Sequence, residues 1–157
     1  MTNHKSSQIL KAIAIAIAAF AFLGSVQSQA LAADDSQAEV LHLRKIMQEL
    51  GNNMQAVTAA ISQEDWARIV QLAPKIAEHH EPPLTEKARI MAYLGTDTMK
   101  FRSFDKQVHE AALAMKQAAA NKDGKAVIGA FARIQESCLG CHQTFRKPFV
   151  EHFYGLR

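Results

Sequence analysis

The chain of 157 residues is poor in cysteine and glycine, with two and seven residues of these types. Cys138 and Cys141 are the only thiols, so a zinc site built on them would need two further ligands of another kind. After Ala33, only Gly51 and Gly95 precede Gly124. Short alternating segments bounded by turn residues are also missing, so a β-sheet is not expected.

The charge pattern excludes further classes of function. No block of basic residues suits a nucleic-acid backbone, and the formal net charge of the whole chain is only +3. The sequence shows neither a pairing of a nucleophile with a base nor a cofactor-binding loop. A turnover enzyme or a nucleic-acid partner is therefore not expected.

The beginning of the chain has the pattern of a secretory signal peptide. No acidic residue occurs before Asp34, whereas Lys5 and Lys11 make the start positive. An unbroken apolar run then extends over residues 12–24, which is too short to cross a bilayer as a helix of the mature protein. These features predict export, and an uncleaved membrane anchor is the alternative.

The predicted cleavage site follows Ala30-Leu31-Ala32, because small residues occupy the two positions that a signal peptidase inspects. We predict a signal peptide over residues 1–32 and a single mature domain over residues 33–157. Loss of the two leader lysines lowers the formal charge from +3 to about +1. No later segment is apolar enough to span a membrane, so a soluble mature protein is expected.

Periodicity in the mature chain predicts four amphipathic helices, and short links between three of them favour an antiparallel four-helix bundle. The expected caps are Asp35 or Ser36, Ser62, Thr85, and Thr96 or Asp97. Pro74 is expected to kink the second helix without ending it. The buried stripes are expected at Val40, Leu43, Met47, Leu50, Met54, Val57 and Ile61; at Trp66, Ile69, Val70, Ala73, Ile76 and Ala77; at Phe101, Phe104, Val108, Ala111, Met115 and Ala118; and at Val127, Phe131, Ile134, Cys138, Cys141, Phe145 and Phe149.

The sequence Cys138-Leu139-Gly140-Cys141-His142 is the attachment motif of a c-type haem. Its two thiols can add to the two haem vinyl groups, and the histidine that follows can bind the iron as the proximal ligand. A redox-active dithiol or half of a zinc site would use the same two cysteines. A dithiol of the thioredoxin kind would need a βαβ context, which the sequence does not offer. We therefore predict one covalent haem on Cys138 and Cys141, with His142 on its iron.

The residues from Cys138 to Arg146 resemble the C-terminal CxxCHxx(F/Y)R signature of class II c-type cytochromes, the cytochrome c′ and cytochrome c-556 family. The first predicted helix, with Arg44, Met47 and Gly51, also resembles the N-terminal helix of that family. The resemblance covers the whole mature chain. It implies an all-α bundle with haem on the last helix, redox partner proteins, a periplasmic location, and in many members a homodimer.

The resemblance also bears on the second axial position of the iron. Alignment through Gly51 and Met54 places Met47 where cytochrome c-556 members supply a methionine and cytochrome c′ members an apolar residue. Independently, the helical seam turns Met47 inward, although most methionines at such positions only fill a core. Met54 is the reserve candidate, and Arg146 is a candidate contact for a haem propionate.

The resulting prediction is a periplasmic electron-transfer protein of the low-spin c-556 type, with His142 and Met47 on the iron. One alternative is a five-coordinate cytochrome c′ that binds nitric oxide or carbon monoxide. A second is a periplasmic metal-handling protein that uses His79 and His80, although a solvated helix end explains these histidines as well. The remaining histidines of the mature chain, His42, His109 and His152, are expected on the surface.

Overall fold

The computed structural model describes residues 41–155, so the predicted signal peptide over residues 1–32 lies outside the described part. Helices make up almost all of the described chain, and no strand occurs in it. The prediction of an all-α four-helix bundle is confirmed. The elements are α2 (His42–Ser62), α3 (Trp66–Ala77), α4 (Leu84–Leu94), the 3₁₀ turn η1 (Gly95–Asp97), α5 (Thr98–Ala120), α6 (Gly124–Cys141), the π-turn η2 (His142–Arg146) and α7 (Lys147–Tyr154).

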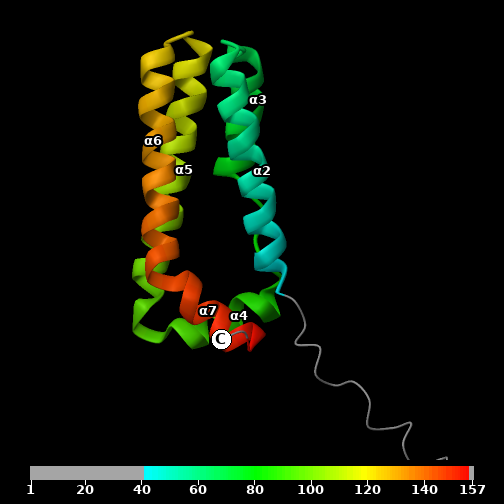
Figure 1. Cartoon of the computed structure of the whole chain (residues 1–157). Coiled ribbons are helices and arrows are strands. Elements are labelled where there is room, and N and C mark those ends of the chain that lie inside the picture. Colours follow the sequence, from blue (N-terminus) through cyan, green and yellow to red (C-terminus); the bar gives the residue numbers. More distant parts are fainter. Residues whose placement is uncertain (1–40, 156–157) are drawn as a thin grey trace, which may run out of the picture. The chain divides into compact units, whose positions relative to one another are not determined.

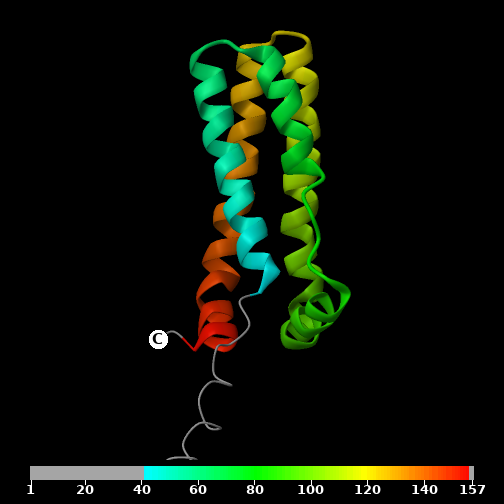
Figure 2. The same ribbon diagram turned by 90° about the vertical axis from the view of Figure 1, so that its right-hand side faces the viewer.

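Four of these helices run lengthwise in two pairs, α2 with α3 and α5 with α6 (Figure 1). The link between α2 and α3 and the link between α5 and α6 lie at the same end of the bundle (Figures 1 and 2). The short helices α4 and α7 lie at the other end. The end of α6, which carries both cysteines, therefore lies toward the end occupied by α4 and α7.

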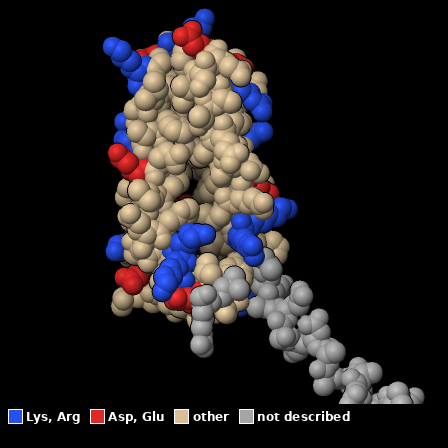
Figure 3. All heavy atoms as spheres, viewed as in Figure 1, with Lys and Arg blue, Asp and Glu red and all other residues tan. Residues whose placement is uncertain are grey.

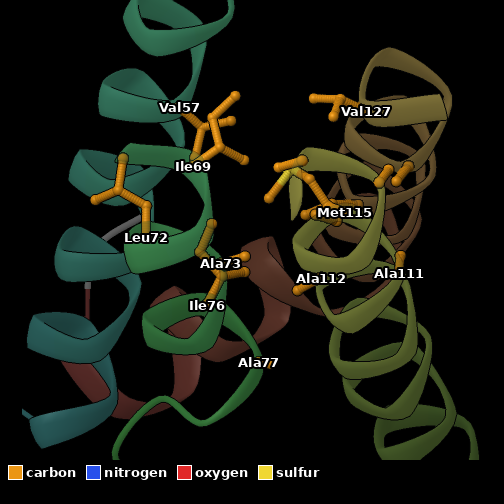
Figure 4. Close-up of a cluster of buried hydrophobic side chains, with 14 of the residues drawn as sticks. Val57, Ile69, Leu72, Ala73, Ile76, Ala77, Ala111, Ala112, Met115 and Val127 are labelled. Carbon is orange, nitrogen blue, oxygen red and sulfur yellow. The ribbon is translucent and has the colours of Figure 1, made fainter. Parts of the chain in front are cut away.

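The main core fills the half of the bundle near the two links. Figure 4 shows Val57 and Ile69 on one side of this core and Met115 and Val127 on the other. All four side chains are essentially inaccessible to solvent. Several alanines of α5 are also fully buried, so α5 and α6 can approach closely along this half.

A second cluster, rich in aromatic rings, closes the opposite end. The Phe101 ring stacks on the Phe149 ring at 5.9 Å between centroids, and Phe145 meets Phe101 edge to face at 5.4 Å. Its buried members come from the chain just before α2, from α4, from η2 and from α7: Leu41, Ile90, Leu94, Phe145, Phe149 and Phe153. Cys138 packs against the main core and Cys141 against this second cluster, so the cysteines lie where the two meet.

Helix α3 has only 12 residues, whereas α5 has 23. As predicted, the helix continues past Pro74, ending at Ala77. Beyond it, residues 79–83 are not helical, because the consecutive prolines Pro82 and Pro83 disfavour helical backbone in the residues before them. The extended chain leaves the lower half of the bundle without a fourth full helix.

The predicted helix caps are partly wrong. Helix α3 is capped by Asp65, which accepts a hydrogen bond from the Arg68 N–H at 2.9 Å, and Ser62 is instead the last residue of α2. Thr85 lies inside α4, whose N-cap position is taken by Pro83. Asp97 does precede α5 but accepts no capping hydrogen bond. The expected caps Asp35 and Ser36 lie outside the described residues.

The start of α2 is capped from a distance by Glu86 of α4. The Glu86 carboxylate accepts hydrogen bonds from the backbone N–H groups of His42 at 2.7 Å and Leu43 at 2.8 Å. Glu86 is only 7% exposed, so water competes little for these donors. One carboxylate therefore caps α2 and ties it to α4, across 44 positions of sequence.

Replacing Glu86 with alanine is expected to destabilise the protein by about 2 kcal/mol, since two partly buried N–H groups lose a charged acceptor. Urea unfolding followed by circular dichroism measures the loss. Glu110→Ala is the matched control, because Glu110 makes only an exposed pair with Lys106 and should cost less than about 0.5 kcal/mol. Equal losses in the two variants would contradict the capping role.

Candidate functional site

A cavity of about 400 Å³ lies between α2, α5 and α6, and the end of α3 reaches it through Ile76. Cys138, Cys141 and His142 line it together. The two cysteines are three residues apart on one helix, so both thiols lie on the same face, and the histidine follows directly. The remaining wall is mainly apolar and includes Leu43, Leu50, Ile76, Ile90, Met91, Phe101, Phe104, Val108 and Ile134.

His142 begins a π-turn, a feature that the sequence analysis missed. The turn covers His142–Arg146, and the chain then continues as α7. Pro148, in the first turn of α7, explains why the α-helix is interrupted here. Its ring has no N–H to donate and would crowd the carbonyl of Thr144 in a regular α-helix. The Thr144 hydroxyl donates to the Gly140 carbonyl at 2.9 Å. The wider turn sets the direction in which the helix leaves the CxxCH motif.

Gly140 lets an aromatic ring approach the motif closely. A Cβ atom added at Gly140 would lie 2.8 Å from Cε1 of Phe104, closer than real Cβ contacts. The spacer residue between the two cysteines is therefore where Phe104 of α5 packs against α6. Since Phe104 also lines the cavity, this contact defines one apolar wall beside the thiols.

Met47 lines the same cavity from α2. Met47 is 39% exposed, whereas Met54, two turns further along, also lines the cavity but is 8% exposed and belongs to the main core. The predicted seam of α2 was incomplete, because Ile46 and Ala60 are buried although the pattern omitted them. The seam residues Leu43, Met47 and Leu50 line the cavity, and Leu43 and Leu50 also pack against the edges of the two clusters.

The electrostatics of the thiols disfavour a redox-active dithiol. Burial raises the pKa of Cys138, and burial together with the nearby charges of Cys138 and Asp105 raises the pKa of Cys141 to about 11. Both groups are thus protonated thiols at neutral pH, whereas a reactive dithiol needs a thiolate. A zinc site is not supported either, because no group of three or more His, Cys, Asp or Glu side chains in residues 41–155 could hold a metal ion.

The pKa of His142 is lowered, first by burial and then by the positive charge of Arg146. Its imidazole is therefore neutral at pH 7, which is the form that binds a metal. Arg146 acts on His142 electrostatically, but it is not among the residues that line the cavity. Two other cationic residues, Lys87 and Arg102, do line it, and the sequence pattern had not singled them out.

Lys87 forms an ion pair with Glu81 at 2.6 Å, and Arg102 makes no ion pair or side-chain hydrogen bond with the described residues. Figure 3 shows Lys and Arg side chains on both sides of the hollow that opens between the helix pairs. A cofactor with an apolar body and acidic groups at one edge would find matching partners here.

His79 and His80, predicted as an alternative metal site, differ in position: His79 lines the cavity of Cys138 and His142, and His80 does not. His79 has both ring nitrogens in hydrogen bonds, Nε2 with Asp105 and Nδ1 with the His80 carbonyl, each at 3.0 Å. These contacts leave no free lone pair on the ring for a metal. The other histidines have exposed side chains: His42 faces Glu86, His109 contacts the Ala77 carbonyl, and His152 stacks on Tyr93.

The residues around the cavity fit a covalently bound haem. The thiols are paired on one helix face, the imidazole beside them is neutral, the walls are apolar, and cationic side chains lie at the edge. The described helices are also too short or too polar to cross a bilayer.

Comparison with known proteins places the chain in a family. The family model described as Cytochrome C' matches residues 32–146. No curated protein and no solved structure gives a significant match. Because the family match covers most of the chain and includes both cysteines and His142, the chain belongs to the cytochrome C' family, whose members bind haem.

Proposed function

We propose that this protein is a periplasmic electron-transfer cytochrome of the low-spin c-556 type. Cys138 and Cys141 would hold one haem through thioether bonds, and His142 and Met47 would be the two ligands to its iron. Haem supplies a one-electron couple when it is bound. The chain's own residues attach it, fix its two axial ligands and shield it from water.

The position of Met47 is the observation that carries this proposal. Met47 and His142 line one cavity from different helices, α2 and the start of η2. A thioether is a soft, polarisable ligand that suits haem iron, and it favours the ferrous state relative to a second imidazole. With both axial positions filled by the protein, no place is left on the iron for a substrate.

The surroundings of the cavity support electron transfer over turnover chemistry. Phe101 and Phe104 contribute aromatic surface to the wall, and the Phe145 ring packs against both. Exclusion of water by such side chains raises the reduction potential of a haem. The partners would then be redox proteins that deliver and remove single electrons.

The absorption spectrum of the purified ferric protein tests the proposal. A low-spin spectrum, together with slow or weak binding of carbon monoxide by the ferrous protein, is the expected result. The aliphatic side chains of Leu43 and Leu50 beside Met47 could also cover an open sixth position. A high-spin spectrum with prompt carbon monoxide binding would therefore replace electron transfer by the gas-binding function of a cytochrome c′.

A further inference from the structure

His79 lies between two cavities. The first is the one that Cys138, Cys141 and His142 line. A second cavity, of about 450 Å³ and lined largely by polar side chains, lies along α2 and α3, and only Leu50 and His79 line both. Since Leu50 is aliphatic, His79 is the one titratable residue shared by the two. The full lining of the second cavity is Glu49, Leu50, Asn52, Asn53, Lys75, Glu78, His79 and His80.

The hydrogen bonds of His79 define its charge. Nδ1 contacts the His80 carbonyl and Nε2 contacts an oxygen of Asp105, each at 3.0 Å. A carbonyl and a carboxylate both accept hydrogen bonds, so each ring nitrogen must donate, which requires the protonated imidazolium. The hydrogen bond with Asp105 raises the pKa of His79 above its ordinary value, against the opposing effect of burial.

The proton that His79 releases most readily is the one on Nδ1. Its acceptor is the neutral carbonyl of His80, whereas the Nε2 proton is held by the negative charge of the Asp105 carboxylate. Loss of the Nδ1 proton leaves a neutral imidazole that still donates from Nε2 to Asp105. The imidazole side chain is 21% exposed, so its charge is less screened than that of a surface histidine.

Other charged groups near His79 also affect its pKa and that of Asp105. The positive charges of His109 and Lys87 help to lower the pKa of Asp105. The negative charge of Glu81 helps to raise the pKa of His79. The titratable or charged residues that line the two cavities with His79 are Glu49, Lys75, Glu78, His80, Glu81, Lys87, Arg102, Asp105, Cys138, Cys141 and His142. None of the others lines both cavities.

We propose that His79 is a proton-binding site coupled to the oxidation state of the haem iron, with the second cavity as its route to solvent. The coupling rests on the proposed function, in that it requires a haem iron in the first cavity that changes charge by one. A cation on His79 disfavours the additional positive charge of ferric iron. Reduction therefore raises the proton affinity of His79, and protonation of His79 favours reduction.

The balance of the step is one electron and one proton. On reduction, an electron arrives at the iron from a donor protein, and a proton moves from water to Nδ1 of His79. On oxidation, the electron leaves to an acceptor protein and the proton returns to water. Below the His79 pKa of the ferric protein the site stays protonated in both states, and only the electron moves.

Potentiometric titration of the haem-loaded protein from about pH 5 to about pH 9 tests the coupling. The wild-type midpoint potential is expected to fall as the pH rises through the His79 pKa. A tenfold difference in proton affinity between the two oxidation states corresponds to about 59 mV between the two limbs. His79→Gln should remove this fall and leave the potential at the level of the wild-type alkaline limb.

Two further variants make the outcome specific. Asp105→Asn removes the charged acceptor of Nε2, so the fall should move to lower pH while its size is kept. His80→Gln is the matched control, because His80 does not line the first cavity, and it should reproduce the wild-type curve. A fall that persists unchanged in both His79→Gln and Asp105→Asn would overturn the proposal and assign the coupled proton to another group.

The absorption spectrum of each sample separates this proposal from the proposed function. A high-spin wild type whose potential depends on pH through His79 would refute Met47 ligation and support the coupling. A low-spin wild type whose pH dependence ignores His79 would refute the coupling alone.

Discussion

Met47→Ala is expected to convert a six-coordinate low-spin haem into a five-coordinate high-spin one. The methyl side chain of alanine cannot reach the iron. Met54 of α2 also lines the cavity, but it is only 8% exposed and packs in the main core. The ferrous variant should bind carbon monoxide promptly, whereas the wild type should bind it slowly because the thioether must leave first. Absorption spectra of the ferric protein and stopped-flow mixing of the ferrous protein with carbon monoxide measure both changes.

Met54→Ala is the matched control, since it removes the same side chain from the same helix two turns away. Loss of a buried methionine leaves a cavity and should lower the free energy of unfolding by about 2–4 kcal/mol. The spin state and the rate of carbon monoxide binding should hardly change. If the two variants exchanged these phenotypes, Met54 would be the ligand, and if neither changed the spectrum, the sixth position would not be a methionine of α2.

Features encoded by nearby residues could be predicted from the sequence. The spacing of apolar side chains in α5 and α6 predicted part of the buried stripe, because each turn of a helix repeats within a few residues. The residues predicted and found buried are Val108, Ala111, Met115, Ala118, Val127 and Ile134. The CxxCH motif identified its cavity for the same reason, since both thiols and the imidazole lie within five consecutive residues. Chemistry that is local in sequence needs no knowledge of packing.

Features that depend on distant residues were missed. Glu86 caps a helix that begins 44 positions earlier, and no local pattern distinguishes such a glutamate from a solvated one. The partner of His79 is likewise 26 positions away, on α5. The burial of Ile46 depends on how α2 is rotated in the bundle, which a seven-residue pattern fixes only to within part of a turn.

The π-turn is an intermediate case, because a local signal existed. Pro148 lies four residues after Thr144, so a regular helix through this segment must lose a hydrogen bond. The apolar periodicity alone, which runs on to Phe149, predicts an uninterrupted helix through Pro148. A proline just beyond CxxCH therefore indicates a change of helix geometry at the histidine of the motif.

The double variant Cys138→Ala, Cys141→Ala is expected to lose covalent haem completely, because these are the only thiols in the chain. Extraction of the wild type with acid and acetone should leave haem on the denatured polypeptide, whereas the double variant should release all of it. Each single variant should keep its haem, since one thioether bond suffices to hold it. The heme absorbance of the polypeptide after extraction measures the retained fraction.

Met47→Ala serves as the control in this extraction, because it removes an axial ligand and leaves both thiols in place. Its haem should stay with the polypeptide even though its spectrum has changed. Attachment and ligation are thereby measured independently: the cysteines determine what survives denaturation, and the axial residues determine the spin state of the folded protein. Free extraction of haem from the wild type would contradict covalent attachment, and the pair of high-pKa thiols on the cavity wall would then need another explanation.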